Sequence, residues 1–95
     1  MDLLWIGNVR TAFVRVYGEN KGISVCNVVI PAVMGDFRRT VLAAAPGEAV
    51  TETYRTDDRK TDVTITGYKQ ADVCVIQKIE IGGNPVDLGS GPLIL

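Results

Sequence analysis

The sequence contains two cysteines and no histidine, which restricts the chemistry that its side chains can perform. Histidine is the usual general base and proton shuttle near neutral pH, and it is also the commonest metal ligand. Without a histidine, neither Cys26 nor Cys74 has the usual partner that turns a thiol into a nucleophile. We therefore predict no catalytic residue, no metal ligand and no cofactor site, and we expect that the protein is not an enzyme.

The same two cysteines lie on an early and a late predicted strand, where the intersheet disulfide of an immunoglobulin-type sandwich would be found. The rest of that signature is missing, because no tryptophan follows Cys26 and Asp72 stands where a tyrosine would be expected. The sequence favours reduced, unpaired cysteines, as is usual for a cytoplasmic protein. A disulfide within the chain or between copies is the alternative.

Four acidic residues near the middle of the chain, Glu52, Asp57, Asp58 and Asp62, suggest a site for a hard cation such as calcium. An EF-hand loop requires oxygen ligands at fixed spacings, a central glycine and a closing glutamate, and this segment lacks that pattern. Basic residues are interleaved with these acids. We interpret the segment as the solvated tip of a hairpin.

The basic residues cluster at only two places along the chain. If a strand over 38–45 pairs with a strand over 48–55, the open ends of this hairpin bring the two groups together. The resulting positive patch would contact phosphate or an acidic protein surface. Its residues are Arg38, Arg39, Arg55, Arg59 and Lys60. This patch carries the alternative function, a small β-barrel that binds single-stranded nucleic acid, although such barrels usually add exposed aromatic residues.

Alternation of apolar and polar residues with a period of two recurs between short turn segments, as in a sandwich or barrel. Pro31 is expected to end a strand, and Pro46-Gly47 suits the centre of a type II turn. A helix over 32–45 is the alternative, which Gly35 and the β-branched Thr40-Val41 disfavour. The predicted strands cover residues 11–17, 23–30, 38–45, 48–55, 61–66 and 72–81.

The predicted fold is therefore all-β: a small antiparallel β-sandwich or partly open β-barrel of six or seven strands, in one domain over residues 1–95. In the strand over 72–81, the alternation places Val73, Val75, Ile79 and Ile81 on one face, with Gln77 interrupting it. The opposite face would carry Cys74, Ile76, Lys78 and Glu80.

Ten basic residues nearly balance eleven acidic ones. A near-neutral chain has no long-range field that attracts nucleic acid or an anionic membrane, and little charge that keeps copies apart. No apolar run reaches the roughly 18 residues that a membrane-spanning helix needs. The first residues lack the basic start of a signal peptide, so we expect synthesis in the cytoplasm.

Short apolar segments at the two ends are the candidates for partner binding. Within one chain they would add edge strands to the sheet, and between chains they would pair with a neighbour's open edge. The residues concerned are Leu4, Trp5, Ile6, Leu93, Ile94 and Leu95.

The leading hypothesis is a non-enzymatic structural or assembly protein that binds protein, including copies of itself. A virion accessory subunit, such as a capsid decoration or a tail component, is its most concrete form. Nucleic acid is the less favoured partner, and neither a membrane nor a small-molecule substrate is expected.

Overall fold

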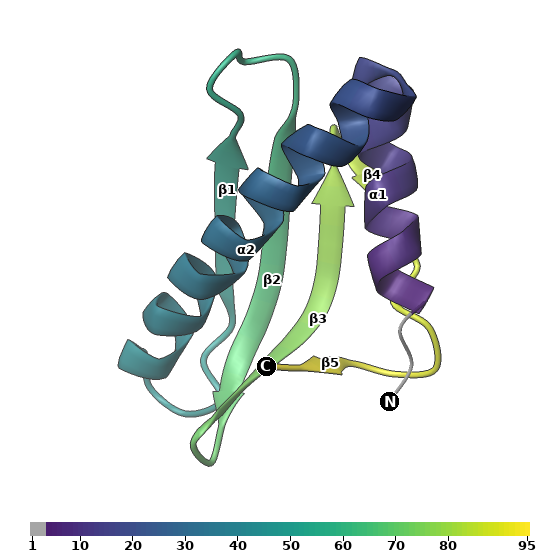
Figure 1. Cartoon of the computed structure of the whole chain (residues 1–95). Helices are drawn as coiled ribbons and strands as arrows, with labels where there is room; N and C mark the ends of the chain where they lie inside the picture. The colour runs from purple at the N-terminus through teal and green to yellow at the C-terminus, as the bar shows by residue number, and fades with distance from the viewer. Residues whose placement is uncertain (1–3) are drawn as a thin grey trace.

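The computed structural model describes residues 4–95, in which two helices cover one face of a five-stranded antiparallel sheet (Figure 1). The helices come first, α1 (Leu4–Tyr17) and α2 (Glu19–Ala43). The strands follow as β1 (Val50–Arg55), β2 (Asp62–Gln70), β3 (Val73–Ile81), β4 (Asn84–Pro85) and β5 (Leu93–Ile94). The chain is α+β and its sheet is open, so the prediction of an all-β sandwich or barrel of six or seven strands is wrong.

The helices form where apolar residues recur at helical spacing. In α1, Val9 and Phe13 are buried four residues apart, while Trp5 and Tyr17 continue the same stripe and pack against the core. In α2, the buried stripe consists of Gly22, Cys26, Val33, Met34, Phe37 and Val41. Residues on one face of a helix recur every three or four positions. The apolar stripe on each helix, buried against the core, is the physical reason that both segments are helical.

Several predicted strands and one predicted loop lie inside these helices. The strands over 11–17, 23–30 and 38–45 and the loop over 31–37 all belong to α1 or α2, apart from the last two residues of 38–45. Their valines and isoleucines fit both periodicities, and burial decides for the helical one. The alternative helix over 32–45 agrees with α2 as far as Ala43.

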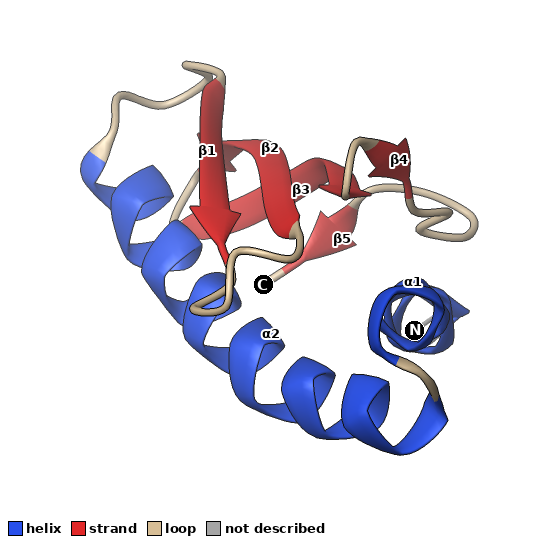
Figure 2. Cartoon of the chain, turned by 90° about the horizontal axis from the view of Figure 1, so that it is seen from above, coloured by secondary structure: helices blue, strands red, loops and turns tan. Residues whose placement is uncertain are grey.

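Pro31 does not end an element, because it lies inside α2. A proline within a helix removes one backbone hydrogen bond, and the helix tolerates this loss when packing elsewhere holds it in place. α2 curves as it passes over the sheet (Figure 2), and its buried residues lie on both sides of Pro31. Gly35 is also within α2, so the prediction that it disfavours a helix here is wrong.

The junction between the two helices depends on two glycines. Gly18 separates α1 from α2 with a φ of 89°, a backbone conformation that favours glycine. Gly22 then lies against the preceding helix, where a Cβ atom would stand 2.6 Å from the Cα atom of Val14. The absence of a side chain at Gly22 therefore lets the α1 and α2 backbones come into close contact.

In the sheet, β2 lies between β1 and β3, and both β4 and β5 pair with β3. The register between β2 and β3 shifts between Thr66 and Gly67, because Thr66 faces Lys78 whereas Gly67 faces Ile76. Gln77 is the extra residue of this β-bulge. The bulge reverses the alternation along β3.

This reversal corrects the predicted faces of β3. Beyond the bulge, Ile79 and Ile81 belong to the core as predicted. Before it, Cys74 and Ile76 belong to the core cluster between the helices and the sheet, and Val73 is 38% exposed. Val75 is buried, at 1% exposed, but lies outside that cluster. A strict period of two carried through the bulge places that half of the strand on the wrong face.

The prediction is better for the second half of the chain. The strands expected over 48–55, 61–66 and 72–81 correspond to β1, β2 and β3, with β2 continuing to Gln70. The turn at Pro46-Gly47 is present, with Gly47 at a φ of 79° and the Glu48 amide donating to the Ala45 carbonyl at 3.1 Å. It joins α2 to β1, because the predicted partner strand over 38–45 is helical.

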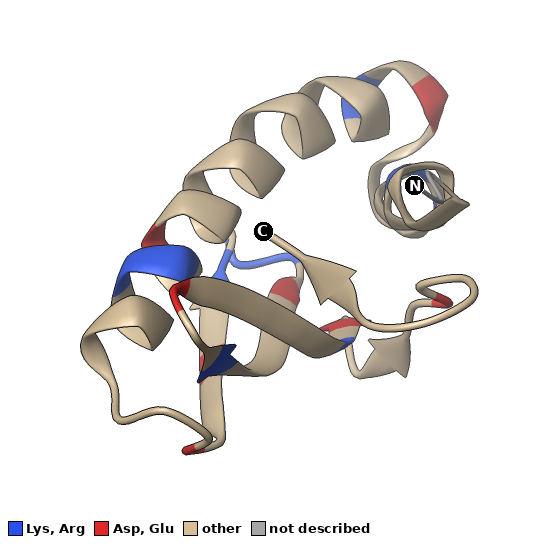
Figure 3. Cartoon of the chain, turned by 90° about the horizontal axis from the view of Figure 1, so that it is seen from below, with Lys and Arg blue, Asp and Glu red and all other residues tan. Residues whose placement is uncertain are grey.

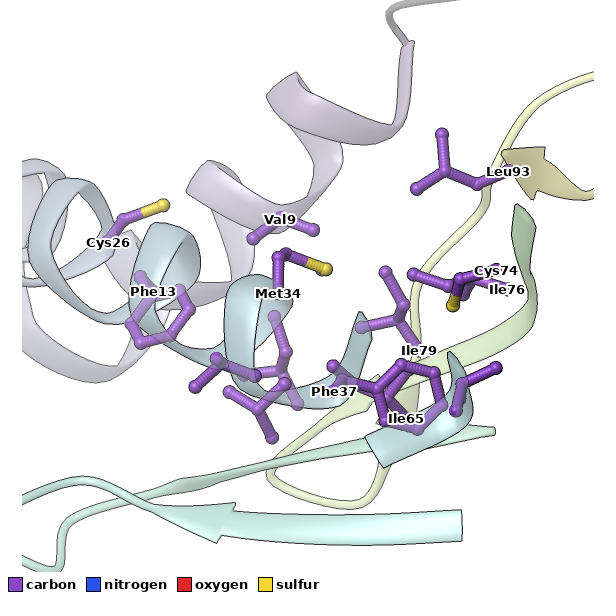
Figure 4. Packing of buried hydrophobic residues seen from close by; sticks show 14 residues of the cluster. Val9, Phe13, Cys26, Met34, Phe37, Ile65, Cys74, Ile76, Ile79 and Leu93 are labelled. Carbon is purple, nitrogen blue, oxygen red and sulfur yellow. The ribbon is translucent and has the colours of Figure 1, made fainter. Parts of the chain in front are cut away.

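The core lies between the helices and the sheet (Figure 4). Its largest fully buried side chains include Phe13 from α1, Phe37 from α2 and Ile65, Ile76 and Ile79 from the sheet. Cys26 and Cys74 are buried as free cysteines on different elements, α2 and β3.

The opposite face of the sheet is polar where β1 and β2 pair. Two hydroxyl pairs join β1 and β2 there, Thr51 with Thr66 at 3.1 Å and Thr53 with Thr64 at 3.0 Å. Cross-strand threonine pairs of this kind stabilise an exposed sheet surface. Within residues 4–95, no helix is long and apolar enough to span a membrane.

Candidate functional site

Two adjoining hollows, of about 410 and 460 Å³, lie between α2 and the end of β1. Val28 and Val29 of α2 line both hollows, and so do Thr56 and Asp57, which follow β1. Together the hollows form one depression, which we call the α2–β1 groove. One of its walls is the flank of a helix and the other is the end of an edge strand.

The helix wall is apolar and in part exposed, because Val25 and Val29 also pack against the core. It consists of Val25, Val28, Val29 and Ala32, which follow one another at positions i, i+3, i+4 and i+7. This spacing is that of a second stripe on α2, beside the stripe that faces the core. Val28 is 73% exposed. A side chain of this kind on a groove wall is available to a partner.

The strand wall is one free edge of the sheet, because β1 pairs with β2 and with no other strand in the described part of the chain. The Thr56 amide donates to the Thr61 carbonyl at 3.0 Å, which fixes the phase of the ladder. Hydrogen-bonded residues alternate along an antiparallel strand. The backbone N–H and C=O groups of Thr51, Thr53 and Arg55 therefore point away from β2, toward the open edge.

Two tyrosine–aspartate hydrogen bonds hold the groove walls in place. The Tyr54 hydroxyl of β1 donates to Asp36 of α2 at 2.8 Å. The Tyr17 hydroxyl at the end of α1 donates to Asp58 of the β1–β2 loop, also at 2.8 Å. β1 is therefore anchored to α2, and the loop that follows it is anchored to α1.

Asp58 organises the loop at one end of the groove. It accepts from the Lys60 amide at 3.0 Å and from the Thr56 hydroxyl at 2.8 Å, in addition to Tyr17. The Lys60 amide and then the Tyr17 hydroxyl are the main reasons that the pKa of Asp58 lies below its ordinary value. Its neighbour Asp57 lines both hollows and has no hydrogen-bond or ion-pair partner among residues 4–95.

The groove offers apolar contact, unpaired backbone groups and a few charges at its rim. Arg55 and Asp57 supply opposite charges at the rim of one hollow. Within the described residues, no three cysteine or acidic side chains are grouped so that they would hold a metal ion. These features suit recognition of an extended polypeptide, which supplies backbone donors and acceptors together with alternating side chains.

The basic residues singled out in the sequence lie on three separate elements. Arg38 and Arg39 are on α2, where Arg39 forms an exposed ion pair with Asp36 at 3.5 Å. Arg55 ends β1 and lines the groove, while Arg59 and Lys60 are in the β1–β2 loop. Lysines and arginines are spread over the helices and the sheet with acidic residues between them (Figure 3). The hairpin predicted to gather them does not form.

The terminal segments have separate places in the fold. Leu4, Trp5 and Ile6 form the start of α1 rather than an edge strand, and Leu3 is outside the described residues. Leu93–Ile94 is β5, which pairs with Val75 and Ile76 of β3, and the Leu95 amide donates to the Cys74 carbonyl. The C-terminal segment therefore adds an edge strand within its own chain.

No family model, curated protein or solved structure matches the chain. The function proposed below consequently rests on the geometry of the α2–β1 groove. The sequence contained one signal for this groove, the i, i+3, i+4, i+7 stripe from Val25 to Ala32. Assigning residues 23–30 to a strand concealed this signal.

Stability should fall at alkaline pH. Burial raises the pKa of the Cys26 and Cys74 thiols, and burial together with the Asp36 hydrogen bond raises the pKa of Tyr54. The unfolded chain loses these protons at lower pH than the folded chain does. The contribution of these groups to the free energy of unfolding is therefore fully present below their ordinary pKa values and is lost as the pH rises above them. Urea denaturation under reducing conditions should give a lower free energy of unfolding at about pH 10.5 than at about pH 8. Equal values at the two pH values would contradict this reasoning.

Proposed function

We propose that the protein is a non-enzymatic binding module that accepts an extended segment of polypeptide at the open edge of β1. The observation that carries this proposal is the open edge of β1, along which the backbone groups of Thr51, Thr53 and Arg55 point outward, and whose Arg55 end meets the apolar wall of α2 in the groove. An incoming strand hydrogen-bonds to the edge, while its alternate side chains enter the α2–β1 groove. This is the β-augmentation mode of recognition.

The two walls of the groove would have different roles in selecting a partner. Backbone hydrogen bonds give affinity for any extended chain, and side-chain pockets give sequence preference. The helix wall favours apolar side chains, because it is built from valine and alanine. Arg55 and Asp57 at the rim favour a partner with charged residues of both signs.

The predicted role in assembly, including that of a virion accessory subunit, is one setting in which such a module would act. The alternative function, binding of single-stranded nucleic acid, gains no specific support from the groove, because Asp36, Asp57 and Asp58 line it beside Arg55 and Lys21. Carboxylates at these positions would repel phosphate.

The test is selection of peptides from a random library displayed in extended form, using the immobilised chain. We expect enrichment of peptides with alternating apolar residues. The Thr53→Pro variant should weaken their binding by at least about tenfold, because proline removes the outward N–H and its ring occupies the edge. Fluorescence anisotropy with a labelled selected peptide measures the change.

Thr53→Ala is the matched control, since it also loses the hydroxyl pair with Thr64 but keeps the backbone N–H. It should bind the selected peptides within about twofold of the wild-type chain. Val28→Asp tests the other wall and should weaken binding without unfolding the chain, because this side chain is 73% exposed. Peptides that bind Thr53→Pro and wild type equally would place the binding surface elsewhere and overturn the proposal.

A further inference from the structure

We infer that the partner that occupies the β1 edge is a second copy of this chain, paired β1 to β1 about a two-fold axis. This inference rests on the proposed function of the edge and adds the identity of the partner. Joining two free edges in this way would give one continuous sheet. Because the axis is perpendicular to the sheet, both pairs of helices would lie on the same face.

The strand is long enough and has the right phase for this pairing. With Thr53 opposite its own symmetry mate, Thr51 faces Arg55 of the second copy and Arg55 faces Thr51. Each of these three pairs consists of residues whose backbone groups point to the open edge. A hydrogen-bonded antiparallel pair exchanges two N–H to C=O bonds, so the register gives about six bonds between the copies.

Charge selects the same register. A two-fold axis at Thr53 places Glu52 opposite Tyr54 of the second copy, so no like charges face each other within β1. An axis at Glu52 would oppose two glutamates, which destabilises a cross-strand pair. An axis at Tyr54 would leave only Thr53 and Arg55 to form backbone bonds within the strand, since Thr51 would lie opposite Asp57. The register with the axis at Thr53 is therefore preferred, because it avoids facing like charges and gives the most backbone hydrogen bonds.

Net charge and the helix wall also fit a second copy. The chain has a formal net charge of −1, so two copies approach each other with little repulsion. With the axis at Thr53, Thr56 and Asp57 lie opposite Val50 and Ala49 of the second copy. The stripe from Val25 to Ala32, which adjoins Thr56 and Asp57, then faces the segment that leads into β1 of that copy. A side chain such as Val28 then becomes covered at the point where the two copies meet. A single interface thus pairs the open backbone groups of β1 and covers the apolar wall of α2.

The experiment is measurement of the solution mass by size-exclusion chromatography with light scattering, in reductant, from about 5 to about 500 µM protein. We expect the weight-average mass to rise with concentration from 10.3 kDa toward twice that value. Thr53→Pro should remain at 10.3 kDa throughout, while Thr53→Ala should dimerise within about twofold of the wild-type dissociation constant. Circular dichroism establishes that both variants are folded.

If Thr53→Pro does not fold, Val28→Asp replaces it, because the exposed Val28 contributes little to the fold. This variant should weaken dimerisation by at least about tenfold. A wild-type chain that stays monomeric at the highest concentration, while still binding selected peptides, would overturn the second-copy inference and leave the proposed function standing. If Thr53→Pro and Val28→Asp dimerise as well as the wild-type chain, the assignment of the interface to β1 is overturned.

Discussion

The Phe37→Ala variant is expected to unfold with a free energy about 3–5 kcal/mol lower than that of the wild-type chain. The Phe37 ring is completely buried in the layer between α2 and the sheet. One of its ring atoms lies 3.1 Å from the position that a Cβ atom of Gly67 would occupy, so the ring rests directly on β2. Alanine would leave a cavity where the helix layer and the sheet meet.

Urea denaturation at neutral pH measures this loss. A chain of this size has a total stability of about 5–15 kcal/mol, so the loss is a large fraction of the total and should lower the urea midpoint clearly. Val28→Ala is the control on the same helix; because Val28 is 73% exposed, its stability should change by less than about 0.5 kcal/mol. A loss below about 1 kcal/mol for Phe37→Ala would contradict the placement of Phe37 in the core.

The second large effect is expected for Gly22→Ala, with a net loss of about 1–3 kcal/mol. Around Gly22, a Cβ atom would stand 2.6 Å from the Cα atom and 2.7 Å from the backbone nitrogen of Val14, and 2.9 Å from the carbonyl carbon of Phe13. These are backbone atoms, which cannot rotate aside as a flexible side chain would. α1 and α2 would have to separate, which loosens the packing of Phe13.

Gly7→Ala provides the matched control for this prediction. Gly7 is inside α1, and a Cβ atom there would have no heavy atom within 4 Å. Both substitutions give the same gain in helix propensity, about 1 kcal/mol, so their difference isolates the contact between the helices. Gly7→Ala should raise the melting temperature and Gly22→Ala should lower it. Equal shifts in differential scanning calorimetry would contradict the close helix contact at Gly22.

The sequence predicted the sheet better than the helices, for a physical reason. β2 alternates with a period of two over most of its length, and turn residues bound both β2 and β3 clearly. In the first half, residues such as Val14 and Val16 alternate with polar residues but are also compatible with a helix. The spacing of four among Trp5, Val9, Phe13 and Tyr17 decided the outcome. Long apolar periodicity was therefore more informative than β-branched composition.

The groove could be predicted only in part. The apolar stripe from Val25 to Ala32 is visible in the sequence once residues 19–43 are assigned to a helix. That β1 is the free edge of the sheet cannot be deduced from local patterns, because strand order is set by long-range packing. The anchoring of Tyr54 to Asp36 and of Tyr17 to Asp58 joins residues far apart in the chain. Such contacts have no signature in a single sequence.

The most direct test of the open β1 edge is residue-resolved amide hydrogen exchange, measured by NMR in a dilute sample, a concentrated sample and a sample saturated with a selected peptide. The amides of Thr51, Thr53 and Arg55 should exchange at least about tenfold more slowly when a second copy or a peptide is bound. Those of Glu52 and Tyr54, which point toward β2, serve as internal controls. Unchanged exchange at the three outward amides with both partners would contradict the account.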